Sequence, residues 1–195
     1  MSTPLERQLL DHIETAKATI AYLPRLERIA EALIDVFASG GHLYTFGNGG
    51  SAADAQHLAA ELIGRYLRER RTLPAVSLST DPSVISCISN DYGFEQLFAR
   101  QVSALARTGD MVIGFTTSGR SPNITHGLAA ARAAGAITAL FTGSSGTGGP
   151  AAAHADHVLA VPTSTTARVQ EMHLILLHLL SERVDTWAVA SQRQN

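Results

Sequence analysis

The sequence predicts an α/β fold: a three-layer sandwich with a central parallel five-stranded sheet, preceded by a helical arm. Two observations predict it. From residue 40 onward, short apolar runs alternate with stretches of helical periodicity, whereas the first 39 residues show helical periodicity alone. Strands that alternate with helices in this way form parallel sheets with right-handed crossovers and helices on both faces. The 195 residues fit one domain, with 1–39 as the arm and 40–195 as the α/β core.

The arm is expected to contain two helices. Its apolar residues recur every three or four positions in two sets: Leu9, Ile13, Ala16 and Ile20, then Leu26, Ile29, Leu33 and Phe37. Between the sets lies Leu23-Pro24, and a residue that precedes proline disfavours the helical conformation. We therefore expect the first helix to end before Pro24.

The core is expected to contain five strands, at residues 42–46, 75–78, 111–116, 137–142 and 157–161. Helical stretches accompany them at residues 52–66, 82–88, 94–105, 124–134 and 168–187. Ligands of such folds bind beyond the carboxyl ends of the strands. The loops after the first and third strands are therefore the expected place for a ligand.

The composition excludes several classes of protein. No stretch approaches the roughly 18 apolar residues of a membrane span, and charged residues near the N-terminus leave no signal peptide. A net charge of −2 argues against nucleic-acid binding. The single cysteine excludes an internal disulfide and a cysteine-based zinc site, and it fits a cytoplasmic protein.

Charged residues make up 16% of the chain and hydrophobic residues 45%. A typical soluble domain has about 25% charged residues. This balance suggests that other subunits cover part of the surface.

Two loops carry residues suited to binding an anion. Residues 47–51 (Gly-Asn-Gly-Gly-Ser) separate a strand from a helix, where glycines admit a ligand and the helix N-terminus favours an anion, although a tight turn explains them equally well. Residues 116–123 contain four hydroxyls before another helix. A helix N-cap explains one of them, whereas a phosphate-binding loop explains all four.

Two helices carry candidate chemical groups. His57 and Glu61 are four residues apart and share a helix face, so they suit a metal, a base at Glu61 or a solvated surface. Gln170 and His178 project from roughly the same side of the last helix. A histidine in so apolar a helix is either a paired core residue or a functional group. The pair Asn90-Asp91 is expected to form an ordinary turn or cap between two helical stretches.

These motifs occur together in segments 47–61, 89–93 (Ser-Asn-Asp-Tyr-Gly), 117–123 and 168–173 (Arg-Val-Gln-Glu-Met-His). On them, the sequence resembles the SIS (sugar isomerase) domain family over nearly its whole length, and within it is similar to the phosphoheptose isomerases. The resemblance implies a flavodoxin-like sheet and a homotetramer with active sites at subunit interfaces, in which the arm assists oligomerisation. It implies conversion of sedoheptulose 7-phosphate to D-glycero-D-manno-heptose 7-phosphate through an enediol.

The resemblance also implies roles for individual residues. Glu61 matches the general base and His178 the other acid/base group, which suits proton transfer between two carbons and their oxygens. Substrate contacts are implied for Asn48, Gly49, Gly50, Ser51, Glu61, Asn90, Asp91, Thr116, Thr117, Ser118, Ser121 and Gln170. The family often has serine where this chain has Thr116, which keeps the hydroxyl. Members that bind zinc, one ion per subunit, use residues matching His57, Glu61, Gln170 and His178.

An alternative from a different class is a non-catalytic SIS domain that binds protein, similar to a bacterial replication-initiator-associating protein. That protein shares much of the Asn-Gly-Gly-Ser and Gln-Glu-Met-His pattern but lacks a histidine at the position that matches His178. The presence of His178 favours the isomerase.

Overall fold

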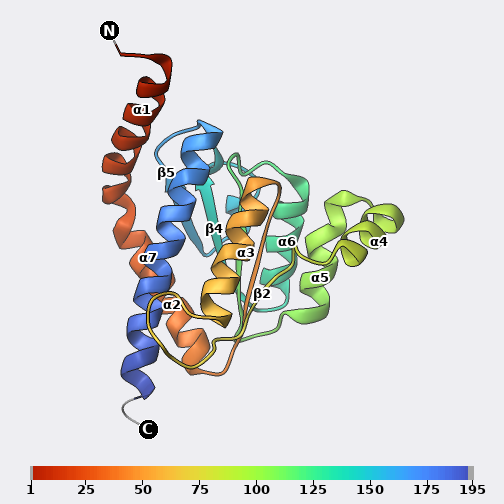
Figure 1. Ribbon diagram of the computed structural model, residues 1–195. Coiled ribbons are helices and arrows are strands. Elements are labelled where there is room, and N and C mark those ends of the chain that lie inside the picture. The colour runs from red at the N-terminus through yellow and green to blue at the C-terminus, as the bar shows by residue number, and fades with distance from the viewer. Residues whose placement is uncertain (1, 193–195) are drawn as a thin grey trace.

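The computed structural model describes residues 2–192 and confirms the predicted fold class. One sheet contains five strands in the order β2-β1-β3-β4-β5, and every neighbouring pair is parallel (Figure 1). The strands are β1 (Leu43–Gly47), β2 (Ala75–Ser77), β3 (Met111–Phe115), β4 (Ile137–Gly143) and β5 (His157–Val161). The chain order reverses at β1 and β3, so the loops that follow these two strands lie side by side at the switch point.

Helices cover both faces of the sheet, because alternate strand residues point to opposite sides. The helices are α1 (Pro4–Thr19), α2 (Leu23–Ala38), α3 (Gly50–Ile63), α4 (Pro82–Tyr92), α5 (Leu97–Leu105), α6 (Pro122–Ala133) and α7 (Thr166–Gln192). Helices α2, α3 and α7 share one apolar core with strand residues such as Phe115 and Phe141. Helices α5 and α6 share the other with Phe46 and Leu140, while α4 packs beside α5. The three-layer prediction is therefore confirmed.

The arm divides where predicted, but for a different reason. Leu23 is helical (φ −56°, ψ −34°), and Pro24 occupies the first turn of α2, where a missing N–H costs nothing. The break is the single 3₁₀ turn Ile20–Tyr22 that precedes Leu23. Helix α1 runs beside α7 and continues past the sheet (Figure 1). His12 of α1 contacts Glu171 of α7 at 2.7 Å.

Most predicted boundaries lie within two residues of the observed ones, with exceptions in four helices. Helix α3 ends at Ile63, three residues earlier than predicted, and α5 begins at Leu97, three residues later, after a 3₁₀ turn. Helix α7 is longer than predicted at both ends. Helix α4 continues to Tyr92 and ends at Gly93, whose φ of +86° suits glycine. Asn90 and Asp91 therefore lie in the last turn of a helix, and the turn predicted for them is wrong. No helix in the described part of the chain is long and apolar enough to span a bilayer.

Candidate active site

The loops after β1 and β3 form a small polar pocket of about 90 Å³ at the carboxyl ends of the strands. This is the place that the alternation of strands and helices predicted. Two side-chain hydrogen bonds join the loops, because the amides of Asn48 and Asn123 each donate to the other, at 2.9 and 2.8 Å. The lining residues are Asn48, Ser51, Phe115, Thr116, Thr117, Ser118, Ser121 and Gln170. Asn123 is an addition to the expected set, and its position in the hydroxyl-rich motif was the available signal.

The four hydroxyls of the second loop divide into two kinds. Thr116 accepts a hydrogen bond from the Gly119 N–H and Ser118 from the Arg120 N–H, both at 3.3 Å, so these two shape the loop. Ser121 is the N-cap residue of α6, yet its side chain makes no capping hydrogen bond. The hydroxyls of Thr117 and Ser121 have no partner among the described residues and line the pocket. N-capping therefore does not explain this motif.

The glycines of the first loop are needed for two different reasons. Gly49 has φ +55°, a conformation that other residues adopt with strain. Gly50 has an ordinary φ, but a Cβ there would lie 2.5–2.9 Å from the amide of Gln170. Gly50 therefore leaves room for the amide of Gln170 from the last helix.

Glu61, His57 and His178 form a cluster between α3 and α7. His57 Nε2 lies 3.0 Å from Glu61 Oε1 and 3.3 Å from His178 Nε2. One ligand atom from each residue lies within 4.8 Å of the other two. The side chains of His57 and Glu61 are 38% and 20% exposed, so the cluster is sheltered but open to a ligand. The spacing in sequence suggested only that His57 and Glu61 share a face; the fold adds His178 from 117 residues further on.

Gln170 lines the polar pocket and is not part of the cluster of His57, Glu61 and His178. It faces Gly50 and lines the pocket with Ser51. Eight residues separate it from His178, which is about 12 Å along the axis of α7. The pocket and the cluster thus lie at two positions along the interface between α3 and α7. We call this interface the α3–α7 seam.

A buried acid and a buried histidine lie in the α3–α7 seam. Asp54 Oδ2 and His173 Nδ1 are 4.0 Å apart, and neither atom has a hydrogen-bond partner among residues 2–192. Burial raises the pKa of Asp54 to about 6, which the attraction of His57 partly opposes. Burial lowers the pKa of His173 to about 4, which its hydrogen bond with the Thr142 carbonyl partly opposes. Sequence reasoning gave neither residue a role; their only signal was a polar side chain within an apolar helical pattern.

Asn90 and Asp91 are not brought to the pocket within this chain. Both are exposed on α4, which lies on the opposite side of the molecule from α7 in Figure 1. Asn90 Nδ2 donates to Asp91 Oδ1 at 2.7 Å, and Cys87 Sγ lies 3.7 Å from Asp91 Oδ2.

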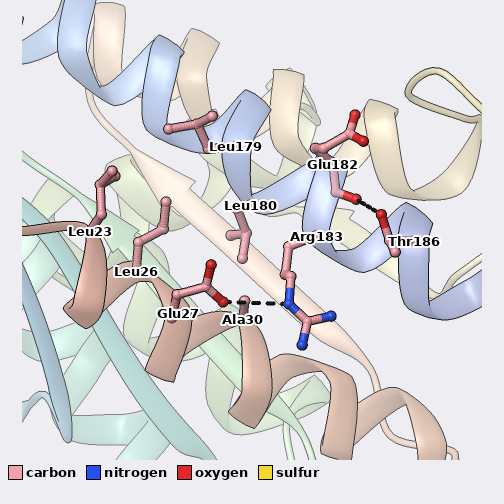
Figure 2. Close-up of a pocket in the computed structure, with 9 residues that line it drawn as sticks. All are labelled: Leu23, Leu26, Glu27, Ala30, Leu179, Leu180, Glu182, Arg183 and Thr186. Carbon is pink, nitrogen blue, oxygen red and sulfur yellow. Dashed lines mark hydrogen bonds and ion pairs between the residues drawn. The ribbon is translucent and has the colours of Figure 1, made fainter. Parts of the chain in front are cut away.

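Figure 2 shows a different cavity, of about 260 Å³, between α2 and α7. Leucine side chains form much of its lining, and an ion pair between Glu27 and Arg183 at 3.4 Å lies beside them. None of the residues predicted for the site lines it. Its two carboxylates, Glu27 and Glu182, are each paired with an arginine.

Comparison with known proteins places this site in a family. Residues 7–143 match the model of the SIS domain. The chain is 48% identical to the phosphoheptose isomerase of Roseiflexus sp. (strain RS-1), covering 94% of this chain and 95% of that protein. Its fold is similar to that of a phosphoheptose isomerase from Neisseria gonorrhoeae, with TM-score 0.87, 36% identity and coverage of 93% and 97%. A phosphoheptose isomerase structure from Francisella tularensis gives TM-score 0.86 and 32% identity, covering 95% of this chain and all of that one.

The chain therefore belongs to the SIS domain family. These three relatives in that family are phosphoheptose isomerases.

Proposed function

We propose that the protein is a ketose–aldose isomerase that converts sedoheptulose 7-phosphate to D-glycero-D-manno-heptose 7-phosphate. One observation carries the proposal: the α3–α7 seam holds a hydroxyl-rich pocket at one position and, further along, a cluster of one carboxylate and two histidines. Such an arrangement suits a substrate with a phosphate at one end and the reacting carbons at the other. The names of the relatives support the same reaction.

The distance between the polar pocket and the cluster supports a long sugar as the substrate. An extended chain advances about 3.5 Å for every three bonds, so the eight bonds from C1 to the phosphorus of a 7-phosphate span about 9 Å. The axial separation of Gln170 and His178 is about 12 Å, which is closer to this length than to that of a short sugar. A three-carbon sugar phosphate, with four such bonds, spans about 5 Å and falls short.

In the proposed mechanism, the hydroxyls of Thr117 and Ser121 bind the phosphate and Glu61 moves the carbon-bound proton. Glu61 removes the proton from C1, and the electron pair of that C–H bond forms the C1=C2 double bond. The C2 carbonyl oxygen takes a proton from His178, which gives the enediol. Glu61 then returns its proton to C2, and His178 recovers one from the C1 hydroxyl as the aldehyde forms. The electrons and protons balance within the substrate.

We propose that Asn48, Gly49, Gly50, Ser51, Thr116, Ser118 and Gln170 complete the substrate contacts. The donor set of the cluster also fits zinc, which in catalytic sites takes three nitrogen or oxygen ligands and keeps a position open. His57, Glu61 and His178 would hold one ion per subunit, whereas Gln170 lies at the pocket. When bound, zinc would supply Lewis-acid polarisation of the substrate oxygens. Within the described residues, Oε1 is the carboxylate oxygen of Glu61 that lies 3.0 Å from His57 Nε2, and Oε2 has no hydrogen-bond partner.

We also propose that the protein acts as a homotetramer with active sites at subunit interfaces. Exposed apolar side chains on α1 support a role for the arm in assembly, namely Leu5, Leu9, Leu10 and Ile13, which are 40–83% exposed. Asn90 and Asp91 lie away from the pocket of their own chain and would reach the pocket of a neighbouring copy.

The test is turnover of sedoheptulose 7-phosphate by the purified protein, with added zinc and with a chelator. We expect aldose product, and we expect Glu61→Gln and His178→Ala each to lower kcat about 10³-fold, as loss of an acid/base group typically does. Thermal unfolding should change by only a few degrees, since both side chains are partly exposed. Absence of product in the presence of zinc would favour the protein-binding alternative instead.

A further inference from the structure

The segment between α3 and β2, residues 64–74, contains no helix or strand, and much of it is exposed. It nevertheless begins three residues after Glu61, where α3 ends, and its Tyr66 lies against the cluster. The ring of Tyr66 stacks on that of His178 with centroids 5.5 Å apart and planes inclined by 23°. Neither the pocket nor the proposed mechanism uses this contact.

The segment is tied to α3 by a buried arginine. The side chain of Arg70 is fully buried. Its Nη2 donates to the carbonyl of Glu61 at 2.7 Å, and its Nη1 donates to the carbonyls of Leu62 at 2.8 Å and Gly64 at 3.0 Å. The last carbonyls of a helix lack partners within the helix, so this guanidinium caps the end of α3 just beyond the proposed base.

The same segment is tied to α7 by a buried aspartate. Asp185 accepts a hydrogen bond from Arg70 Nε at 2.8 Å and from the backbone N–H groups of Leu67 and Arg68 at 3.0 and 3.1 Å. These donors lower the pKa of Asp185 although burial opposes them. Asp185 lies seven residues after His178, two turns of helix, and so on the same face of α7. The Arg70–Asp185 pair thus joins the helix of Glu61 to the helix of His178.

His178 has little else to orient it. Within residues 2–192 its one side-chain hydrogen-bond partner is His57, itself a partly exposed residue of the cluster. The edge of the His57 ring meets the face of His178, with centroids 4.9 Å apart at 75°. Tyr66 is therefore the stacked neighbour that restricts the imidazole of His178.

We propose that Tyr66 is a positioning residue: held by the Arg70–Asp185 lock, it fixes the ring of His178 toward His57 and Glu61. The part of this inference that concerns turnover rests on the proposed function. Its effect on the geometry of the three ligand atoms, however, is a property of the folded chain. Residues that orient metal ligands typically change metal affinity by 10–100-fold when lost, so the affinity of the cluster for a metal reports on the role of Tyr66.

The first experiment measures binding of Co²⁺ alone to metal-free protein, by chelator competition and by the visible absorption of the bound ion. We expect Tyr66→Ala to weaken Co²⁺ binding about 10-fold and to lower kcat for sedoheptulose 7-phosphate more than it raises KM. Tyr66→Phe keeps the stacked ring and should restore both within threefold. Tyr22→Ala is the matched control, since Tyr22 is also half-buried but stacks on Arg25 in the arm.

A second variant tests the lock without leaving one buried charge alone. The double change Arg70→Met with Asp185→Leu removes both charges at similar volume, a replacement that folded proteins often tolerate. We expect it to expose residues 64–73 to trypsin, which cleaves after arginine at 65, 68 and 71, and to weaken Co²⁺ binding as Tyr66→Ala does. If this folded variant resists trypsin as the parent does and binds Co²⁺ with unchanged affinity, the proposed role of the Arg70–Asp185 pair is wrong.

The outcomes separate the two proposals. If Tyr66→Ala binds Co²⁺ like the parent while losing thermal stability like Tyr22→Ala, Tyr66 is structural only and the inference is wrong. If the parent protein binds Co²⁺ and Tyr66→Ala weakens that binding, but no variant turns over the sugar phosphate, the inference stands and the proposed function fails.

Discussion

Helices α5 and α6 cover their face of the sheet with apolar side chains, whereas α3 and α7 bury charged groups on the other face. In α5 and α6 as described, the one buried polar side chain is Asn123, at the first turn of α6. The other face buries Asp54, Arg70, His173 and Asp185, and these lie where two helices meet each other. An interface between two helices brings side chains from two rigid elements close together. The face under α5 and α6 is therefore almost wholly apolar, whereas the other face combines an apolar core with buried ionisable groups.

The largest effect should come from breaking the apolar face. Phe98 of α5 is 1% exposed and stacks on Phe46 with ring centroids 4.6 Å apart. Phe98→Ala should lower the free energy of unfolding by about 4 kcal/mol, the transfer and cavity cost of such a change. Denaturant unfolding measures this loss. The kcat per folded molecule should stay within threefold of the parent value. A large loss of kcat in the folded fraction would show that packing under α5 and α6 also controls turnover.

The second prediction concerns pH and the buried pair on the seam face. Between about pH 4 and 6, the folded protein holds a proton on Asp54 and the unfolded chain holds one on a histidine, because their pKa values are shifted in opposite directions. The proton counts are equal, so the two contributions to the pH dependence cancel. Each single variant should uncover the contribution of the other residue.

In Asp54→Asn, His173 acts alone. Its pKa is lowered in the folded state, so stability should fall by about 3 kcal/mol as the pH drops from 6.5 to 4. In His173→Gln, Asp54 acts alone with a raised pKa. Stability should then be greatest below pH 4 and fall by about 3 kcal/mol as the pH rises through 6. Denaturant unfolding between pH 4 and 7 measures both slopes, and parallel slopes in the two variants would contradict the assignment.

The sequence predicted most of the fold because its signals are local. Alternation of apolar runs with helical stretches marked all five strands, and the loops at 47–51 and 116–123 were visible from glycine and hydroxyl spacing. The division between the faces was not predictable in this way. Arg70 and Asp185 are 115 residues apart, and no local pattern links them. Tyr66 was predicted to end the helix at residues 52–66, but α3 ends at Ile63, and only the packing of α3 against α7 brings Tyr66 to His178.

Asn90 and Asp91 show the opposite limit. Their motif was easy to find, yet α4 continues through both residues and leaves them exposed on the side of the molecule away from α7. A motif identifies residues with a role, whereas the fold of one chain shows which of them meet. The hydroxyls of the pocket allow the same distinction to be tested one atom at a time.

The smallest predicted effect compares two hydroxyls. Ser121 lines the pocket and makes no capping bond, whereas Thr138 of β4 both donates to the Asp156 carboxylate at 2.8 Å and accepts from its N–H at 3.0 Å. Ser121→Ala should raise KM for the sugar phosphate about tenfold, which is about 1.4 kcal/mol, with stability changed by less than about 0.5 kcal/mol. Thr138→Val should do the reverse, lowering stability by about 1–2 kcal/mol with KM unchanged.

Steady-state kinetics and denaturant unfolding of both variants decide the comparison. A hydroxyl that stabilises the protein has its partners inside the protein, and one that binds substrate is left without them until the substrate arrives. If Ser121→Ala instead destabilises the fold and leaves KM unchanged, its hydroxyl is a structural group, and the phosphate must be held by Thr117 and the backbone of the loop.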